Sequence, residues 1–311
     1  GGRPHGHTMS LPGVADWEAR GARVALHGHQ TFFVDEGPRD APVLLFLHGY
    51  PTSSHGLAPA LPHLTAGRRV VAHDHLGFGL SDKPADYGYS LMEQADQALA
   101  LWRHLGIERA HLVAHDYGTS VATELLARRE RGLLPIALDS VTLCNGSMHI
   151  ELADLRVIQV LLRNAWTGPL AARLASRALF ARNMRRILAK AEVLDDDAID
   201  GMWALLERDD GRLRMPQITQ YLLERRRFWH RWIGALTRLD LPCHVLWGRR
   251  DPVAVPAIGQ QVADETPGAQ LTWLEELGHY PMLEDPAAWS AAVLGFMDDV
   301  DGRHGAGGGG A

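Results

Sequence analysis

Short apolar runs recur along the chain in the pattern of buried β-strands. Val43 to Leu47 is continuously apolar, as expected of a strand covered on both faces of a sheet. Similar runs predict seven further strands, at 23–27, 30–34, 69–74, 110–114, 140–144, 243–247 and 270–274. The first two flank Gly28 and predict a hairpin, whereas the others alternate with helical patterns. That alternation is typical of an α/β fold with a doubly wound, mostly parallel sheet.

Helical spacing of apolar residues fills the segments between these strands. Over 91–105 the spacing predicts a helix with Ser90 as its N-cap and Glu93 as the partner in a capping box. Further helices are expected at 118–129, 255–263 and 286–298. Helices that alternate with strands in this way pack on both faces of a parallel sheet.

One long segment lacks any strand signal. Residues 147–240 are rich in Ala, Leu, Arg and Trp at helical spacing, interrupted at Gly168-Pro169 and Met215-Pro216. A helical block between two α/β halves predicts a cap above the carboxyl ends of the strands, where ligands bind in open α/β folds. The expected organisation is therefore an N-terminal extension (1–20), a first core part (21–146), a helical cap (147–240), a second core part (241–300) and a glycine-rich flexible tail (301–311).

Composition and charge are those of a soluble globular protein. The 311 residues are 46% hydrophobic and 22% charged, and no apolar stretch approaches the roughly 20 residues of a membrane span. The polar start of the chain lacks the apolar core of a secretory signal. Cys144 and Cys243 lie in apolar runs, as buried free thiols do. We therefore expect a cytoplasmic protein, either a monomer or a homodimer.

The net charge of −6 is unevenly distributed, because residues 147–240 hold 16 Lys and Arg against 12 Asp and Glu. Arginines and aromatics at 225–232 fall at helical spacing. That spacing favours a solvated helix face with an apolar face against the core over a nucleic-acid or membrane-surface patch. Neither a nucleic-acid nor a membrane partner is expected.

Asp116 stands where a reactive residue is expected. It follows the strand pattern of 110–114 and precedes the helical pattern of 118–129, the context in which a sharp turn exposes a nucleophile at the top of a parallel sheet. A serine at this position would attack acyl carbonyls. A carboxylate is already ionised at neutral pH and attacks an electrophilic sp3 carbon, giving an enzyme-bound ester that water must cleave. Epoxides and alkyl halides are therefore favoured over ordinary esters as substrates.

Three further signals follow strands in a consistent order. The His48-Gly49-Tyr50-Pro51 segment ends a buried strand and can supply the N–H of Tyr50 as an oxyanion donor, with the N–H of Tyr117 as the second. Asp251 follows the strand at 243–247, where it can orient a histidine, cap the next helix, or do both. His279 lies in the loop after the last strand. The order nucleophile, acid, histidine is that of α/β-hydrolase triads.

These motifs resemble the epoxide-hydrolase-like and haloalkane-dehalogenase-like branch of the α/β-hydrolase superfamily, from about Val24 to Phe296. Residues 74–81 are similar to the D-x-x-G-x-G-x-S segment of that branch, and 48–51 to its H-G-x-P loop. The chain also resembles the mesoderm-specific-transcript group of epoxide-hydrolase-like proteins, through the segments 51–54, 115–118, 231–236 and 279–286. The resemblance implies an α/β-hydrolase fold with an inserted helical cap.

Two departures from that branch bear on the substrate. Its dehalogenases usually grip the halide with a Trp after the nucleophile and an Asn or Trp from the oxyanion loop or cap, but this chain has Tyr117 and Tyr50. Its epoxide hydrolases usually use two cap tyrosines, and Tyr221 is the only tyrosine between 147 and 240. Either Tyr221 suffices, or Tyr117 or a histidine substitutes, or the substrate is different. Many members also place the acid after the strand before the cap, where this chain has Asn145, so Asp251 is the better candidate.

The sequence predicts a hydrolase in which Asp116 forms a covalent alkyl ester and opens epoxides to diols. Tyr221 is expected to donate to the epoxide oxygen, and His279, oriented by Asp251, to activate the water that cleaves the ester. Substrate contacts are expected from His48, Tyr50, Pro51, His115, Tyr117, Tyr221 and Tyr280.

The expected partner is a small apolar electrophile, and the mechanism requires no cofactor or metal. The alternatives are a haloalkane dehalogenase, an ester or lactone hydrolase and, in another class, a non-catalytic binding protein with this fold.

Overall fold

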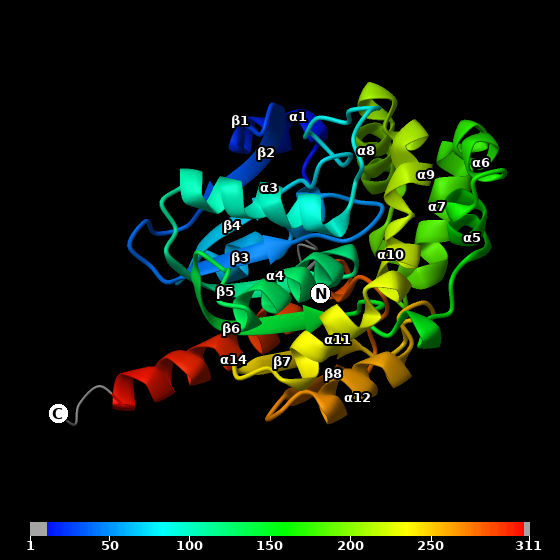
Figure 1. Cartoon of the computed structure of the whole chain (residues 1–311). Helices are drawn as coiled ribbons and strands as arrows, with labels where there is room; N and C mark the ends of the chain where they lie inside the picture. The colour runs from blue at the N-terminus through cyan, green and yellow to red at the C-terminus, as the bar shows by residue number, and fades with distance from the viewer. Residues whose placement is uncertain (1–10, 308–311) are drawn as a thin grey trace, which may run out of the picture.

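The apolar runs form the eight strands of a single sheet in the computed structural model, which describes residues 11–307 (Figure 1). The strand order is β1-β2-β4-β3-β5-β6-β7-β8; β1 and β2 are antiparallel to their neighbours and all later pairs are parallel. All eight predicted strands are present: β1 (Ala22–Leu26), β2 (His29–Glu36), β3 (Val43–Leu47), β4 (Arg69–His73), β5 (Arg109–His115), β6 (Ala137–Cys144), β7 (Cys243–Gly248) and β8 (Gln270–Leu274).

Helices cover both faces of the sheet and form the cap. On one face α3, α4 and α11 pack side by side, and α14 lies on the other face (Figure 1). The short helix α2 packs on α14. The helices are α1 (Val14–Arg20), α2 (Leu61–Leu64), α3 (Leu91–His104), α4 (Tyr117–Glu130), α5 (Val157–Arg163), α6 (Gly168–Leu174), α7 (Arg177–Ile187), α8 (Asp196–Glu207), α9 (Met215–Ile218), α10 (Tyr221–Arg227), α11 (Trp229–Thr237), α12 (Pro256–Glu265), α13 (Pro281–Glu284) and α14 (Pro286–Gly307). Four short 3-10 helices accompany them, η1 (Ser54–Leu57), η2 (Ile150–Leu152), η3 (Ala191–Val193) and η4 (Arg208–Arg214).

The insertion between β6 and β7 contains only helices and turns, as its sequence predicts. Its last helix, α11, packs on α4 of the core, because the buried carboxylate of Glu124 accepts hydrogen bonds from the side chains of Arg231 and Trp232. We therefore end the cap before α11, earlier than the expected boundary at 240, and count α5 to α10 as the cap.

The capping box predicted for α3 is not formed. Ser90 accepts a hydrogen bond from the N–H of Met92, as an N-cap residue does. The reciprocal carboxylate is supplied by Glu224 of α10, which accepts from the N–H of Leu91 and the hydroxyl of Ser90. A cap residue thus closes the start of a core helix and ties the two parts together.

Both chain ends carry more structure than predicted. Within the expected extension, residues 14–20 form α1, whose Trp17 is fully buried with its ring 5.9 Å from that of His55. The expected flexible tail begins too early, because α14 continues through 301 to Gly307. Residues 1–10 and 308–311 lie outside the described residues.

Both cysteines are buried free thiols, as predicted. Among residues 11–307, no helix is both long enough and apolar enough to span a bilayer.

Candidate active site

The turn between β5 and α4 holds Asp116 in a strained conformation, with its side chain buried and lining an internal cavity. Its φ of +49° and ψ of −115° lie outside the regions that non-glycine residues normally adopt, as expected of a nucleophile elbow. Two glycines allow the close approach. A Cβ on Gly118 would lie 2.2 Å from the carbonyl oxygen of Leu47, and one on Gly49 would lie 2.7 Å from the Cβ of Asp116. Larger residues at either position would displace the elements that present the carboxylate.

The loop after β3 provides a backbone donor to this carboxylate. The N–H of Tyr50 donates to Oδ2 of Asp116 at 2.7 Å. The loop is fixed from behind, because the hydroxyl of Tyr280 donates to the carbonyl oxygen of Tyr50 at 2.7 Å. Tyr117 is the first residue of α4, so its N–H has no partner within the helix. The two N–H groups expected to form an oxyanion hole therefore flank the carboxylate of Asp116.

The three residues predicted as a triad come together although they are far apart in the chain. Nε2 of His279 lies 3.1 Å from Oδ1 of Asp116, and Nδ1 of His279 lies 2.6 Å from Oδ2 of Asp251. All three side chains are almost fully buried. The imidazole is thus fixed between two carboxylates.

Charge and burial together set the protonation of this group. Burial alone would raise the pKa of Asp116, but His279 and the N–H of Tyr50 more than offset it and hold the pKa below its usual value. Burial would likewise lower the pKa of His279, but Asp251 and Asp116 raise it to about 10. His279 therefore rests as an imidazolium that contacts both Asp116 and Asp251.

Asp251 is positioned by a residue whose role the sequence did not reveal. Its Oδ1 accepts from the N–H groups of Val253 and Ala254, and its Oδ2 accepts from Nδ2 of Asn145 at 2.9 Å as well as from His279. The helix that follows begins at Pro256 with Val255 as its N-cap, so the capping role considered for Asp251 is not observed. The side chain of Asn145 also donates to the carbonyl oxygen of Gly248 and accepts from the N–H of Gly248. These two hydrogen bonds join the ends of β6 and β7. The sequence signal that could have revealed this role is the position of Asn145 directly after a buried strand, next to β5 in the sheet.

Above the triad lies a cavity of about 100 Å³ enclosed largely by cap residues. Asp116, His279, Tyr50 and Pro51 contribute to its lining from the core. Most of the remaining lining is apolar, from Ile158, Leu162, Leu179, Phe180, Met184, Ile187, Trp203, Leu206, Met215 and Val253. A ligand in this cavity would be surrounded mainly by hydrocarbon, with the polar triad at one end.

Four of the expected substrate contacts instead support the site from behind. His48, His115, Tyr117 and Tyr280 do not line the cavity. Nε2 of His48 accepts from the backbone N–H of His75, and Nε2 of His115 donates to the carbonyl oxygen of His279. Burial lowers the pKa of His48 to about 4 and that of His115 to about 3, so both rings are neutral. Their placement does not support the contacts that we expected from the sequence.

Tyr221 is buried at the boundary between cap and core. Its ring centroid lies 4.9 Å from that of Tyr117 and 6.3 Å from that of Tyr50, although Tyr221 is not part of the cavity lining. Its hydroxyl makes no hydrogen bond within the described chain. Burial raises the pKa of Tyr221 well above its usual value, and the charge of Asp116 raises it further. The phenol is therefore neutral, and its hydroxyl proton is available for donation.

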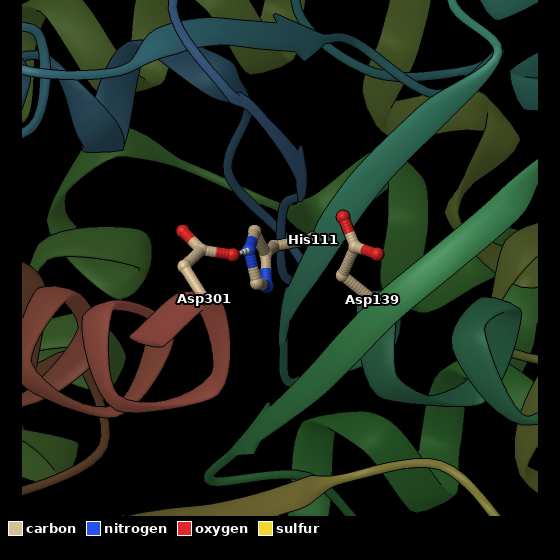
Figure 2. A group of neighbouring side chains, drawn as sticks. All are labelled: His111, Asp139 and Asp301. Atoms are coloured by element: carbon tan, nitrogen blue, oxygen red, sulfur yellow. Dashed lines mark hydrogen bonds and ion pairs between the residues drawn. The ribbon is translucent and has the colours of Figure 1, made fainter. Parts of the chain in front are cut away.

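A separate group of side chains has the spacing of a metal site. Figure 2 shows His111, Asp139 and Asp301, whose potential ligand atoms lie within 4.8 Å of one another. His111 lies at the start of β5, at the opposite end of the strand from Asp116. These atoms already have partners: His111 contacts Ser140 and Asp301, Arg68 lies 2.7 Å from Asp301, and Arg109 pairs with Asp139. These contacts explain why the three side chains lie together: they form a polar link between α14 and the sheet.

Comparison with known proteins agrees with this architecture. The family model described as alpha/beta hydrolase fold matches residues 42–286. A protein of Mycobacterium tuberculosis named "Putative hydrolase LipZ" is 42% identical over 292 residues, which cover 94% of this chain and 100% of that protein. The mesoderm-specific transcript protein of Mus musculus is 33% identical over 296 residues, covering 92% and 88%.

Solved structures show the same fold. A loop variant of the haloalkane dehalogenase DbeA from Bradyrhizobium elkanii has a TM-score of 0.78 at 23% identity, covering 92% of this chain and 98% of that one.

Proposed function

The chain belongs to the α/β-hydrolase fold family, and we propose that its Asp116 forms a covalent ester with an epoxide, which water then cleaves to a diol. The proposal is carried by one observation, a carboxylate at the elbow that contacts both the N–H of Tyr50 and the imidazolium of His279. A carboxylate in this position is a nucleophile for carbon without prior deprotonation. The apolar lining of the cavity suits an uncharged electrophile.

In the first step an oxygen of Asp116 bonds to a ring carbon while the carbon–oxygen bond of the epoxide breaks. The electron pair of that bond leaves an alkoxide, for which we propose the Tyr221 phenol as the proton donor; its ring is not part of the cavity lining but lies 6.3 Å from that of Tyr50, which is. Because burial raises the pKa of Tyr221, the phenol keeps its proton until a strong base such as the alkoxide forms. This step converts the Asp116 carboxylate into a neutral ester.

The loss of that negative charge prepares the second step. His279 now lies beside only one carboxylate, so it can transfer its proton to the Tyr221 phenolate. Neutral His279 then takes a proton from water as the water oxygen bonds to the carbonyl carbon of the ester. The oxyanion is stabilised by the N–H groups of Tyr50 and Tyr117, each worth about 3 kcal/mol. Collapse expels the diol alkoxide, which takes the proton of the acid formed, and Asp116 is again ionised beside an imidazolium.

Dehalogenation is the second candidate, because one residue of the cavity suits a halide. Trp203 contributes to the lining of the cavity, and an indole N–H can donate to a departing halide. Against this candidate, the residue after the nucleophile is Tyr117, whose ring is fully buried against Phe78 and lies outside the cavity lining. Both candidates share the same covalent ester.

The ester is tested by a single turnover in heavy-oxygen water with terminal epoxyalkanes and styrene oxide. Water attack on the ester carbonyl should leave the label in the peptide that contains Asp116, and the first product molecule should carry none. Label in that first product, with none in the protein, would establish direct attack of water on the substrate and refute the proposal. Bromoalkanes assayed for halide release in parallel distinguish the second candidate.

A matched pair of variants separates the two steps. His279→Gln should form the ester without cleaving it, so the protein mass should rise by the mass of one substrate molecule. Asp116→Ala should show no such increase while its thermal unfolding remains cooperative. An Asp116→Ala protein that turns over epoxides at the wild-type rate would contradict the assignment of the nucleophile.

A further inference from the structure

The outer face of the cap exposes large apolar side chains. Trp166 is 91% exposed, Val157 76% and Leu174 68%. Of the ten large hydrophobic side chains found exposed in the described part of the chain, eight lie between 152 and 179. We call this surface the cap face and define it by Val157, Val160, Leu161, Trp166, Leu170 and Leu174. Exposed apolar residues gathered on one surface mark an interaction site more often than isolated ones do.

The cap face is formed by two helices that pack on each other. Val157 and its neighbours belong to α5, Leu170 and Leu174 to α6, and Trp166 to the turn between them. Figure 1 shows both helices at the outer edge of the cap, on the side away from the sheet. The exposed residues are therefore not covered by another part of the described chain.

The same segment is strongly basic in an acidic protein. Residues 155–190 contain eight Lys and Arg and no Asp or Glu, whereas the whole chain has a net charge of −6. Arg173 is exposed beside Leu174 and forms no ion pair with any described residue. Arg177 and Arg185 of this segment pair with Asp196 and Asp200, so the positive charge left on the cap face itself is that of Arg163 and Arg173. A surface that combines exposed apolar side chains with this positive charge fits a partner that is apolar and negatively charged.

We propose that the cap face binds the surface of an anionic phospholipid membrane. Amphipathic segments with basic residues and an exposed Trp insert at the boundary between headgroups and acyl chains, and anionic lipids attract the basic residues. A second copy of this chain fits the face less well. A symmetric dimer would bring the two cap faces together and oppose their positive charges.

This surface could not be recognised from the sequence, which indicated membrane contact neither through a spanning segment nor through residues 225–232. The helical pattern of 157–174 did not reveal which of its apolar residues face outward. Their exposure in the structure is what changes the expectation that the protein has no membrane partner.

The location of the cap face gives membrane binding a consequence for the site. Ile158 and Leu162 of α5 and Ala172 of α6 line the cavity, while the opposite sides of the same helices carry the cap face. Two short helices thus separate the cavity from the bound lipid surface. An apolar substrate dissolved in the membrane would then be concentrated next to the helices that enclose the cavity, a consequence that rests on the proposed function, whereas membrane binding itself does not.

Membrane binding is tested by sedimenting the purified protein with vesicles and without any substrate. One set of vesicles contains phosphatidylcholine alone, and in the other part of it is replaced by phosphatidylglycerol. Wild type should sediment with the anionic vesicles, and added salt should weaken this binding. Arg173→Gln should reduce affinity for anionic vesicles about fivefold, the contribution of one basic residue near such a surface. Trp166→Ser should weaken binding by at least as much.

Leu133→Ser is the matched control, because Leu133 is 66% exposed but lies after α4, far along the chain from the cap face. It should bind like wild type, and all three variants should keep the wild-type unfolding midpoint since the replaced side chains are exposed. Failure of wild type to bind anionic vesicles would overturn the proposal, as would undiminished binding by Trp166→Ser. A lipid-free dimer that Trp166→Ser dissociates in sedimentation velocity would assign the cap face to a second copy instead.

Discussion

Replacing Asp116 by asparagine should release the proton that the site holds on His279, and no substrate is needed to observe it. In the wild type burial would lower the pKa of His279, but Asp251 and Asp116 raise it to about 10. The Asp116→Asn substitution keeps the size of the side chain and removes its charge, as esterification does. The variant therefore imitates the intermediate in which His279 must become a base.

The distance in the site sets the expected size of the effect. Nε2 of His279 lies 3.1 Å from Oδ1 of Asp116. At an effective dielectric constant of about 20, two unit charges at this distance attract by about 5 kcal/mol. This energy corresponds to at most about four pH units, so the midpoint should fall from about 10 to roughly 6–8. At the lower end of this range His279 would be largely neutral at physiological pH, as the second step requires.

The same linkage predicts the pH dependence of stability. Because the pKa of His279 is raised on folding from its usual 6.5, its ion pairs stabilise the wild type fully below that pH. This contribution is lost as the pH rises through about 10. In the Asp116→Asn variant much of it should be absent, so stability should fall less between neutral and alkaline pH.

Histidine-labelled protein allows the titration to be followed by NMR. The signal of His279 is identified by its disappearance from the spectrum of His279→Gln. As a control, Asp301→Asn removes a carboxylate 2.8 Å from Nε2 of His111, and it should change the titration of His111 alone. If His279 titrates at the same pH in Asp116→Asn as in wild type, Asp116 does not hold its proton, and the proposed change of role between the two steps is refuted.

Three further predictions concern stability and each chemical step. Glu124→Gln should lower the free energy of unfolding, measured in urea, by about 3 kcal/mol, because this buried carboxylate accepts four hydrogen bonds. As a control, Glu130→Gln removes one partner of an exposed ion pair on the same helix and should change the free energy of unfolding little. Tyr221→Phe should slow ester formation from epoxides by about 10²–10⁴-fold in rapid-quench experiments and leave ester cleavage unchanged; an unchanged first step would remove Tyr221 from the mechanism. Asp251→Asn should slow ester cleavage by up to about 10⁴-fold. Asn145→Ala should slow it less, because the carboxylate remains, and equal losses would mean that the amide matters as much as the charge.

The strands, and the meeting of Asp116, Asp251 and His279, could be predicted because both follow from local signals in the sequence. A strand buried on both faces, such as β3, is continuously apolar, and that signal depends little on the rest of the fold. Reactive residues at the ends of parallel strands meet at one edge of the sheet, so Asp116 and Asp251 could be assigned from their positions after strands. The order of the strands then brings them together.

Contacts between distant segments were the part that the sequence did not determine. Glu93 has the spacing of a capping-box residue, yet Glu224 of α10 supplies the carboxylate, because tertiary packing brings it to the helix start. The same limit applies to rings near the site. His48 and Tyr280 follow strands as expected, but which side of the loop a ring occupies depends on packing that no local pattern encodes.

Asn145 shows how the position of the acid constrains its neighbour. Nδ2 of Asn145 lies 2.9 Å from Oδ2 of Asp251, the oxygen that also accepts from His279. Two carboxylates at this distance would not both stay ionised, and a shared proton would weaken the charge beside the imidazole. An amide instead donates to Oδ2 without adding a second negative charge. With the acid at Asp251, residue 145 must be a neutral donor, so the pair forms a single unit that orients His279.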